Sequence, residues 1–216
     1  EHAQAAAEKV TIEYEQLPEY LNYLEAVMPD AVRIHDDHPN MWNLQPTLEG
    51  ASYDTPKLID EAEYVVEGSF YSQREPHMPI EGDTVQAYWG DDGLLTVHCK
   101  AMAIGANVGD IAEATGLDAE KVRVIENPTG GTFGWGIAGA TYSLAAIACM
   151  ACDDMPVALS MTYDQFMAYS GKRAPSFSNS RLACDKDGKI VAAEWDFGLD
   201  HGAYDELGDD LTWRTA

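Results

Sequence analysis

The sequence has few positive charges. Thirteen Lys and Arg residues stand against 37 Asp and Glu residues, which gives a formal net charge of -24 over 216 residues. A surface this acidic repels the phosphates of nucleic acids and the anionic headgroups of lipids. We therefore expect neither a nucleic acid nor a membrane as a partner. An anionic ligand would have to be held by backbone N–H groups rather than by a basic patch.

Cysteines and long apolar runs are also scarce. Four cysteines are too few for a disulfide scaffold, so we expect a reducing compartment and a cytoplasmic location. The longest apolar run, around residues 144–151, is far shorter than the roughly 20 residues that a membrane-spanning helix needs. These two absences favour a protein that folds around an ordinary apolar core.

The length corresponds to one large or two small domains, at roughly 150 residues per domain. Residues 18–60 contain five prolines and show little periodicity, which predicts an extended connector between residues 1–17 and residues 61–216. Residues 10–14 alternate like a strand, and residues 211–216 end on large apolar side chains without a stop signal. We therefore expect a piece of a longer chain.

Beyond residue 60 the pattern predicts short strands with interspersed helices. Predicted strands cover residues 64–70, 84–89, 95–99, 121–126, 157–161, 181–184 and 190–196, and predicted helices cover residues 110–115, 140–152 and 163–170. Asn107 is a candidate helix cap, and Thr162 with Gln165 forms a capping box. Because strands pair locally and no regular repeat is visible, we expect a mixed α/β fold of the α+β class.

The most informative segment is rich in glycine. Residues 127–139 read Asn-Pro-Thr-Gly-Gly-Thr-Phe-Gly-Trp-Gly-Ile-Ala-Gly and lie between a predicted strand and a predicted helix. Glycine lets the backbone approach a ligand without a Cβ in the way, and N–H groups at a helix start favour negative charge. Phe133 and Trp135 lie among the glycines, which favours a loop that faces a ligand over one that only packs tightly.

Part of this segment, Gly134-x-Gly136-x-x-Gly139, matches the dinucleotide-binding fingerprint. The first glycine of a true fingerprint lies at the end of a strand, whereas about eight residues separate Glu126 from Gly134. No acidic residue stands clearly at the position about 20 residues later that would bind a ribose. A nicotinamide-dependent oxidoreductase is therefore an alternative interpretation, and a non-catalytic assembly domain is another.

Other polar clusters admit two interpretations each. Cys149 and Cys152 have the spacing of a redox motif but lie at the C-terminal end of a predicted helix, which favours core packing. His35 and His38 have no cysteine nearby, so we expect no metal site. The run Glu-Pro-His-Met-Pro-Ile-Glu at residues 75–81 fits a binding site as well as a rigid loop.

Four segments together resemble the molybdenum-binding subunit of the xanthine oxidase family, most closely the bacterial aldehyde oxidoreductases. They are residues 73–81, the Gly-Gly-Thr-Phe-Gly run at 130–134, Gly-Lys-Arg-Ala-Pro at 171–175, and Asp-His-Gly-Ala-Tyr at 200–204. The resemblance covers essentially the whole chain. It implies that residues 1–17 are the tail of a hammerhead-type domain and residues 61–216 the first half of a molybdenum cofactor-binding domain.

The resemblance implies an enzyme that hydroxylates an aldehyde or a heterocycle with oxygen derived from water. The implied cofactor is a molybdopterin, often in the cytosine dinucleotide form. By match, Gly131, Thr132, Phe133 and Gly134 would place backbone N–H groups and an aromatic ring against the molybdenum ligands. Glu75 stands where many members carry a Gln near the apical molybdenum oxygen.

The resemblance also bears on the substrate and on what the chain does not contain. Purine-oxidising members place a Glu at the position of Ile137, so an apolar residue here favours an aldehyde over a purine. The family's general base is a Glu in a Gly-x-Gly-Glu segment, which does not occur in these 216 residues. We therefore expect no catalytic residue in this chain and no activity of the chain alone. Iron–sulfur clusters and flavin would belong to other domains or partner subunits.

Overall fold

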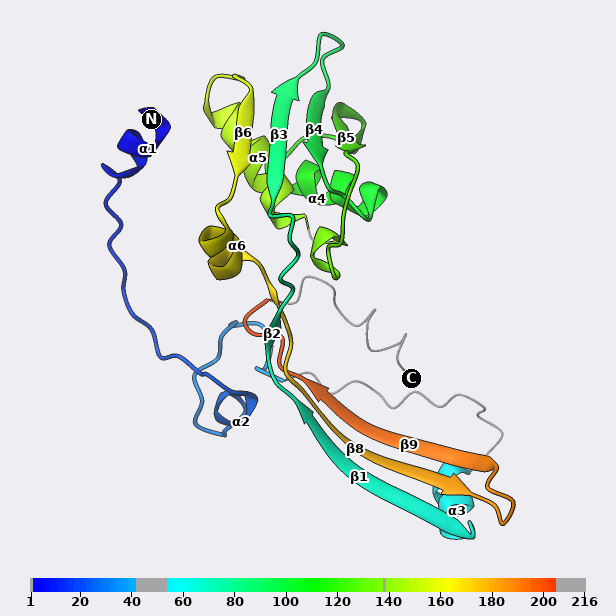
Figure 1. The fold of residues 1–216 in the computed structure, drawn as a ribbon. Helices are drawn as coiled ribbons and strands as arrows, with labels where there is room; N and C mark the ends of the chain where they lie inside the picture. Colours follow the sequence, from blue (N-terminus) through cyan, green and yellow to red (C-terminus); the bar gives the residue numbers. More distant parts are fainter. Residues whose placement is uncertain (1, 42–53, 138, 205–216) are drawn as a thin grey trace. The chain divides into compact units, whose positions relative to one another are not determined.

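The computed structural model describes residues 2–41, 54–137 and 139–204 (Figure 1). It divides into two compact units, residues 1–50 and residues 51–216. The predicted division into residues 1–17, 18–60 and 61–216 places its boundaries elsewhere, and it remains a prediction. The predicted chain end at residues 211–216 lies outside the described residues.

The first unit contains helices α1 (His2–Ala7) and α2 (Tyr23–Ala26). Asn22 caps α2 by accepting a hydrogen bond from the Glu25 N–H at 3.0 Å. Asn40 links the segment after α2 to the end of that helix, because its Nδ2 donates to the Ala26 carbonyl at 2.9 Å. The predicted strand at residues 10–14 was wrong, since this stretch is extended but pairs with no described strand.

A four-stranded sheet in the order β5-β4-β3-β6 forms the centre of the second unit. Its strands are β3 (Thr84–Trp89), β4 (Leu95–Cys99), β5 (Val122–Glu126) and β6 (Val157–Ser160). The hairpin β3–β4 has the predicted bounds and turns at Gly93, whose φ of 74° suits glycine. β4 and β5 run parallel, so the expected local pairing holds for the hairpin but not for this crossover.

Helix α4 (Ile104–Thr115) and the short 3₁₀ helix η1 (Ala119–Lys121) make the crossover between β4 and β5, and α5 (Ala140–Ala151) packs against the same sheet. The core lies between them, and its fully buried side chains include those of Val85, Val97, Ile111, Tyr142 and Cys149. This packing fixes the starting points of the segments that build the candidate site.

Helix α4 begins six residues earlier than predicted. Its two internal glycines, Gly105 and Gly109, lower the helix propensity and concealed its first half from sequence analysis. Asn107 is not its cap, because it lies inside the helix, is fully buried, and donates from Nδ2 to the Ile137 carbonyl at 3.0 Å. Gly116 ends the helix in the left-handed conformation with φ of 72°, as a C-terminal glycine does.

A second sheet has the antiparallel order β1-β8-β9, with β1 (Tyr64–Ser72), β8 (Ser176–Cys184) and β9 (Ile190–Leu199). The hairpin β8–β9 turns at residues 185–188 as predicted, but both strands are longer than predicted. Helix α3 (Thr55–Asp60) contacts β8 and β9. It begins at the N-cap Asp54, and Pro56 lies in its first turn, where proline is favoured.

Two short strands and one helix complete the second unit. β2 (Glu75–Pro76) pairs antiparallel with β7 (Lys172–Arg173), and α6 (Tyr163–Tyr169) precedes β7. The predicted capping box of α6 is confirmed, with the Gln165 N–H donating to Thr162 Oγ1 at 3.2 Å. Among the described residues, no helix is long and apolar enough to cross a membrane.

Loss of this cap should destabilise α6 locally. We expect Thr162→Ala to cost about 1 kcal/mol and to speed hydrogen exchange of the first α6 amides roughly fivefold, because an N–H group loses its acceptor. Hydrogen exchange followed by mass spectrometry measures this effect. Thr162→Ser keeps the hydroxyl and is the control; equal exchange in both variants would contradict the role of the cap.

Candidate functional site

The glycine-rich loop leaves the sheet at the end of β5 and leads through the 3₁₀ helix η2 (Trp135–Ile137) into α5. Phe133 has a φ of 54° and Gly134 a φ of 103°, both in the left-handed half of backbone space. A non-glycine residue there is uncommon and marks a tightly constrained turn. The Phe133 side chain is 58% exposed, so its ring lies on the surface of the loop.

The loop is tied to its surroundings at both ends but keeps several N–H groups open. The Gly130 N–H donates to Glu81 Oε2 at 3.1 Å, and Arg173 Nη2 donates to the Phe133 carbonyl at 3.3 Å. No hydrogen bond joins the N–H groups of Gly131, Thr132 or Phe133 to any residue that the structure describes. Open N–H groups beside a left-handed residue form a concave site that attracts anions.

His77 approaches the loop from the β2 side. Its Nδ1 lies 3.0 Å from the Gly171 carbonyl, which can only accept, so Nδ1 carries the proton and Nε2 is left as an acceptor. Nε2 faces Gly134, where an added Cβ would lie 3.7 Å away. Burial lowers the pKa of His77, the cations Arg173 and Lys172 lower it further, and the hydrogen bond to Gly171 partly opposes them.

The four sequence segments predicted to act together do meet. In the β2–β7 pair Glu75 lies opposite Arg173, whose guanidinium reaches the glycine-rich loop. The Asp200 N–H donates to the Pro175 carbonyl at 3.0 Å, and Asp200 Oδ1 lies 3.9 Å from Arg74 Nη2. Residues 73–81 and 171–175 therefore lie against the loop, and Asp200 contacts both of these segments.

The remaining predicted site residues have distinct positions. Glu75 is exposed, Thr132 is buried with its hydroxyl on the Met102 sulfur, and Ile137 is half-buried. His201, in the last predicted segment, is exposed.

Sequence analysis missed two ionised residues beneath the loop. Lys100 Nζ and Asp83 Oδ1 lie 3.0 Å apart, and both residues are almost fully buried. Asp83 directly precedes β3 and Lys100 directly follows β4, so each extends an apolar strand. A charged residue adjoining a buried strand was the signal available, since such residues are rarely buried without a partner.

The structure gives the glycines of the dinucleotide pattern another role. β5 ends at Glu126, well before Gly134. A Cβ on Gly136 would lie 2.9 Å from Thr132 Cγ2 and 3.0 Å from the Lys100 carbonyl, and one on Gly139 would lie 2.6 Å from Asp110 Oδ2. These two glycines allow close packing within the protein, which differs from the geometry of a dinucleotide fingerprint.

Neither the cysteine pair nor a metal cluster adds to the site. Cys149 is fully buried in the core, and burial raises the pKa of its thiol, as predicted for a packing role. The same prediction was wrong for Cys152, which is exposed at the C-terminal end of α5. Within the described ranges, no group of His, Cys, Asp and Glu side chains could hold a metal ion.

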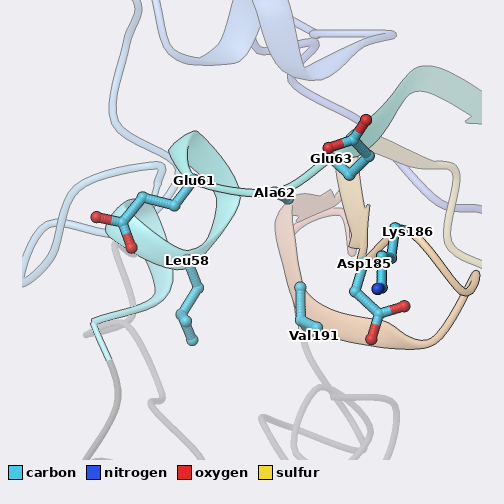
Figure 2. A pocket seen from close by; sticks show the side chains of 7 residues that line it. All are labelled: Leu58, Glu61, Ala62, Glu63, Asp185, Lys186 and Val191. Atoms are coloured by element: carbon cyan, nitrogen blue, oxygen red, sulfur yellow. The ribbon is translucent and has the colours of Figure 1, made fainter.

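A surface pocket of about 370 Å³ lies away from the loop (Figure 2). Its walls come from α3 with the residues after it and from the β8–β9 hairpin, namely Leu58, Glu61, Ala62, Glu63, Asp185, Lys186 and Val191. Three of these side chains are carboxylates and none is a predicted site residue. The pocket gives no support to an anion site.

Comparison with known proteins identifies the family. Residues 34–216 match the model of the molybdopterin cofactor-binding domain. The chain belongs to this family. The aldehyde oxidoreductase of Megalodesulfovibrio gigas is 42% identical over 215 residues, which is 100% of this chain but 23% of that protein. The large molybdopterin subunit of Eubacterium barkeri nicotinate dehydrogenase is 28% identical over 95% of this chain and 47% of that subunit.

Solved structures agree with this family assignment. The aldehyde oxidoreductase from Desulfovibrio gigas superposes with a TM-score of 0.87 at 42% identity, over 98% of this chain and 23% of that one. The expected mixed fold of a molybdopterin-binding domain is therefore confirmed. The chain spans about a quarter of the length of the aldehyde oxidoreductases that it matches.

The environment of His77 predicts a titration below its ordinary range. The folded state favours the neutral imidazole, so the stability that His77 contributes is complete above pH 6.5 and is lost as the pH falls toward the lowered pKa. Deuteration of the imidazole carbon, followed by mass spectrometry across pH, should show a midpoint below 6.5. The same peptide in urea is the control, and a folded midpoint at or above 6.5 would contradict the assignment.

Proposed function

We propose that the chain forms one wall of a molybdopterin pocket in a larger oxidoreductase that oxidises an aldehyde. The observation that carries the proposal is the glycine-rich loop, where the N–H groups of Gly131, Thr132 and Phe133 have no acceptor among the described residues. Residues 73–81 and 171–175 lie beside it. Such a loop is suited to an anionic ligand. Family membership supports a molybdopterin as this anion.

The chemistry of the donor set fits this cofactor. The chain carries a net charge of -24, yet Arg74, Lys172 and Arg173 gather in and beside the β2–β7 pair next to the loop. Burial and the nearby Arg74 lower the pKa of Lys172. A pterin phosphate would therefore meet local cations and backbone N–H groups in an otherwise repulsive field.

Each site residue takes a role that its position allows. Gly131, Thr132 and Phe133 would present N–H groups and an exposed ring to the molybdenum ligands. Gly134, whose N–H donates to Thr132 Oγ1 at 3.4 Å, would let the backbone approach them closely. Glu75 would face the same centre, and the Arg173 guanidinium in the opposite position would offset its charge. His77 Nε2 would accept a hydrogen bond from the ligand. When bound, the cofactor supplies a two-electron oxidation with oxygen from water.

The substrate and the rest of the enzyme are part of the proposal. Ile137 would form an apolar substrate wall, which favours an aldehyde or another weakly polar molecule over a purine. The general base, the iron–sulfur clusters and the flavin would lie in the remainder of the enzyme or in partner subunits, because the relatives are longer than this chain. The cytosine dinucleotide form, the cytoplasmic location, the hammerhead-type tail at residues 1–17, the connector at residues 18–60 and the half domain at residues 61–216 belong to this proposal too.

The test is a cofactor analysis of the full-length protein that contains this chain, purified from its native host. We expect close to one molybdenum atom and one pterin per chain, and oxidation of aldehydes. The isolated chain should show no such oxidation. Absence of both molybdenum and pterin would overturn the proposal and favour an assembly domain, and saturable NAD(H) binding without pterin would favour the nicotinamide alternative.

A second experiment tests the role of Ile137 in the same protein. We expect Ile137→Glu to lower kcat/KM for an apolar aldehyde by about tenfold or more, since a hydrophobic pocket difference is worth roughly 1–3 kcal/mol. Steady-state kinetics at matched cofactor content measures the change. Ile137→Leu is the control, and unchanged kinetics in both variants would place Ile137 outside the substrate pocket.

A further inference from the structure

Within the described part of the second unit, an ion pair is buried beneath the glycine-rich loop. Asp83 is 1% exposed and Lys100 is 2% exposed, and Lys100 Nζ lies 3.0 Å from Asp83 Oδ1. Lys100 Nζ also donates to the carbonyls of Glu81 at 2.9 Å and Gly82 at 3.4 Å, and lies 5.4 Å from the centre of the Phe166 ring. The ammonium is therefore surrounded by acceptors and an aromatic face.

Stability alone does not explain such a pair. Desolvating two charges costs about as much as their attraction returns, and an apolar pair of similar volume is often as stable. The pKa of the Cys99 thiol is raised to about 11, mainly by burial and in part by the negative charge of Asp83. The electrostatic field of the buried carboxylate therefore reaches this neighbouring side chain. Because burying the Asp83–Lys100 pair brings little net stability, we expect the pair to have a role other than packing.

That role follows from the second carboxylate oxygen. Asp83 Oδ2 accepts a hydrogen bond from Trp135 Nε1 at 2.6 Å and another from Thr141 Oγ1 at 3.0 Å. Trp135 directly follows the loop residue Gly134, and Thr141 lies in the first turn of α5. One carboxylate therefore fixes both the exit of the glycine-rich loop and the start of the helix behind it.

Trp135 passes this constraint to the other segments of the site. Its ring packs against Gly171, where an added Cβ would lie 2.9 Å away, and its centre is 6.0 Å from that of the His77 ring. It also meets Phe166 edge to face at 6.3 Å. The backbone of Lys100 contributes too, since its carbonyl accepts from the Tyr142 hydroxyl at 3.2 Å.

We propose that Asp83, Lys100 and Trp135 are positioning residues that hold the glycine-rich loop in its ligand-binding conformation. The ion pair fixes the carboxylate, the carboxylate fixes the indole, and the indole fixes the exit of the loop and the contact with Gly171 and His77. This inference rests on the proposed function, because the ligand held by the loop is the molybdopterin.

Two double variants separate positioning from stability. Asp83→Leu with Lys100→Met removes both charges and every acceptor for the Trp135 N–H. Asp83→Asn with Lys100→Met removes the same charges but keeps a carbonyl oxygen for that N–H. Trp135→Phe removes the donor and leaves the ion pair intact. Single substitutions of Asp83 or Lys100 are not used, because each would leave the other charge buried without a partner and would unfold the site.

The experiment measures pterin release from the purified full-length holoenzyme, alongside the melting temperature of each variant. We expect release about tenfold faster or more in the Leu/Met and Phe variants, and within about twofold of wild type in the Asn/Met variant, because the hydrogen bond between residue 135 and a side-chain oxygen of residue 83 is lost only in the first two. The two double variants should melt at similar temperatures, so the difference in release reports the position of Trp135.

The outcomes are distinct. Wild-type release rates in the Phe and Leu/Met variants would overturn the positioning role while leaving the proposed function intact. Release that follows the melting temperature across all three variants would also overturn it, because the triad would then act through stability. A wild-type protein without pterin would overturn both proposals.

Discussion

The buried carboxylate of Asp83 constrains the rest of the site. A carboxylate removed from water must have its charge and its lone pairs satisfied by protein groups. Here these groups come from the end of β4, from the residue after the glycine-rich loop and from the first turn of α5. The sheet, the loop and the helix therefore each contribute a group to one buried carboxylate.

The acidity of the chain explains why this loop is built from backbone. A net charge of -24 opposes any anion that approaches from solvent. N–H groups of a constrained turn attract an anion at short range, where the general field matters less. Arg173 lies opposite Glu75 in the β2–β7 pair and donates to the Phe133 carbonyl of the loop, so a cation adjoins these N–H groups. The proposed site would thus attract negative charge locally on a protein of negative net charge.

Local signals in the sequence predicted a large part of this fold. The β3–β4 hairpin and the capping box of α6 depend on residues close together in the chain, and both were predicted correctly. The glycine-rich loop was recognised because its composition is unusual over a short stretch. The start of α4 was missed because Gly105 weakens the pattern and Ala103 offers no capping side chain. Contacts between distant segments, such as Lys100 with Asp83, leave no comparable local signal.

The pairing of β1 with β8 has a consequence for how the protein acquires its ligand. A hydrogen bond from Ser69 to Asn179 joins residues 110 positions apart. Contacts this far apart in the chain close slowly, because the entropy of the intervening loop is lost before they form. β2 and β7 continue from these strands, so the segments around the loop come together only after nearly the whole second unit has been synthesised. A ligand held by the glycine-rich loop would therefore find its complete site only after β2 and β7 have paired.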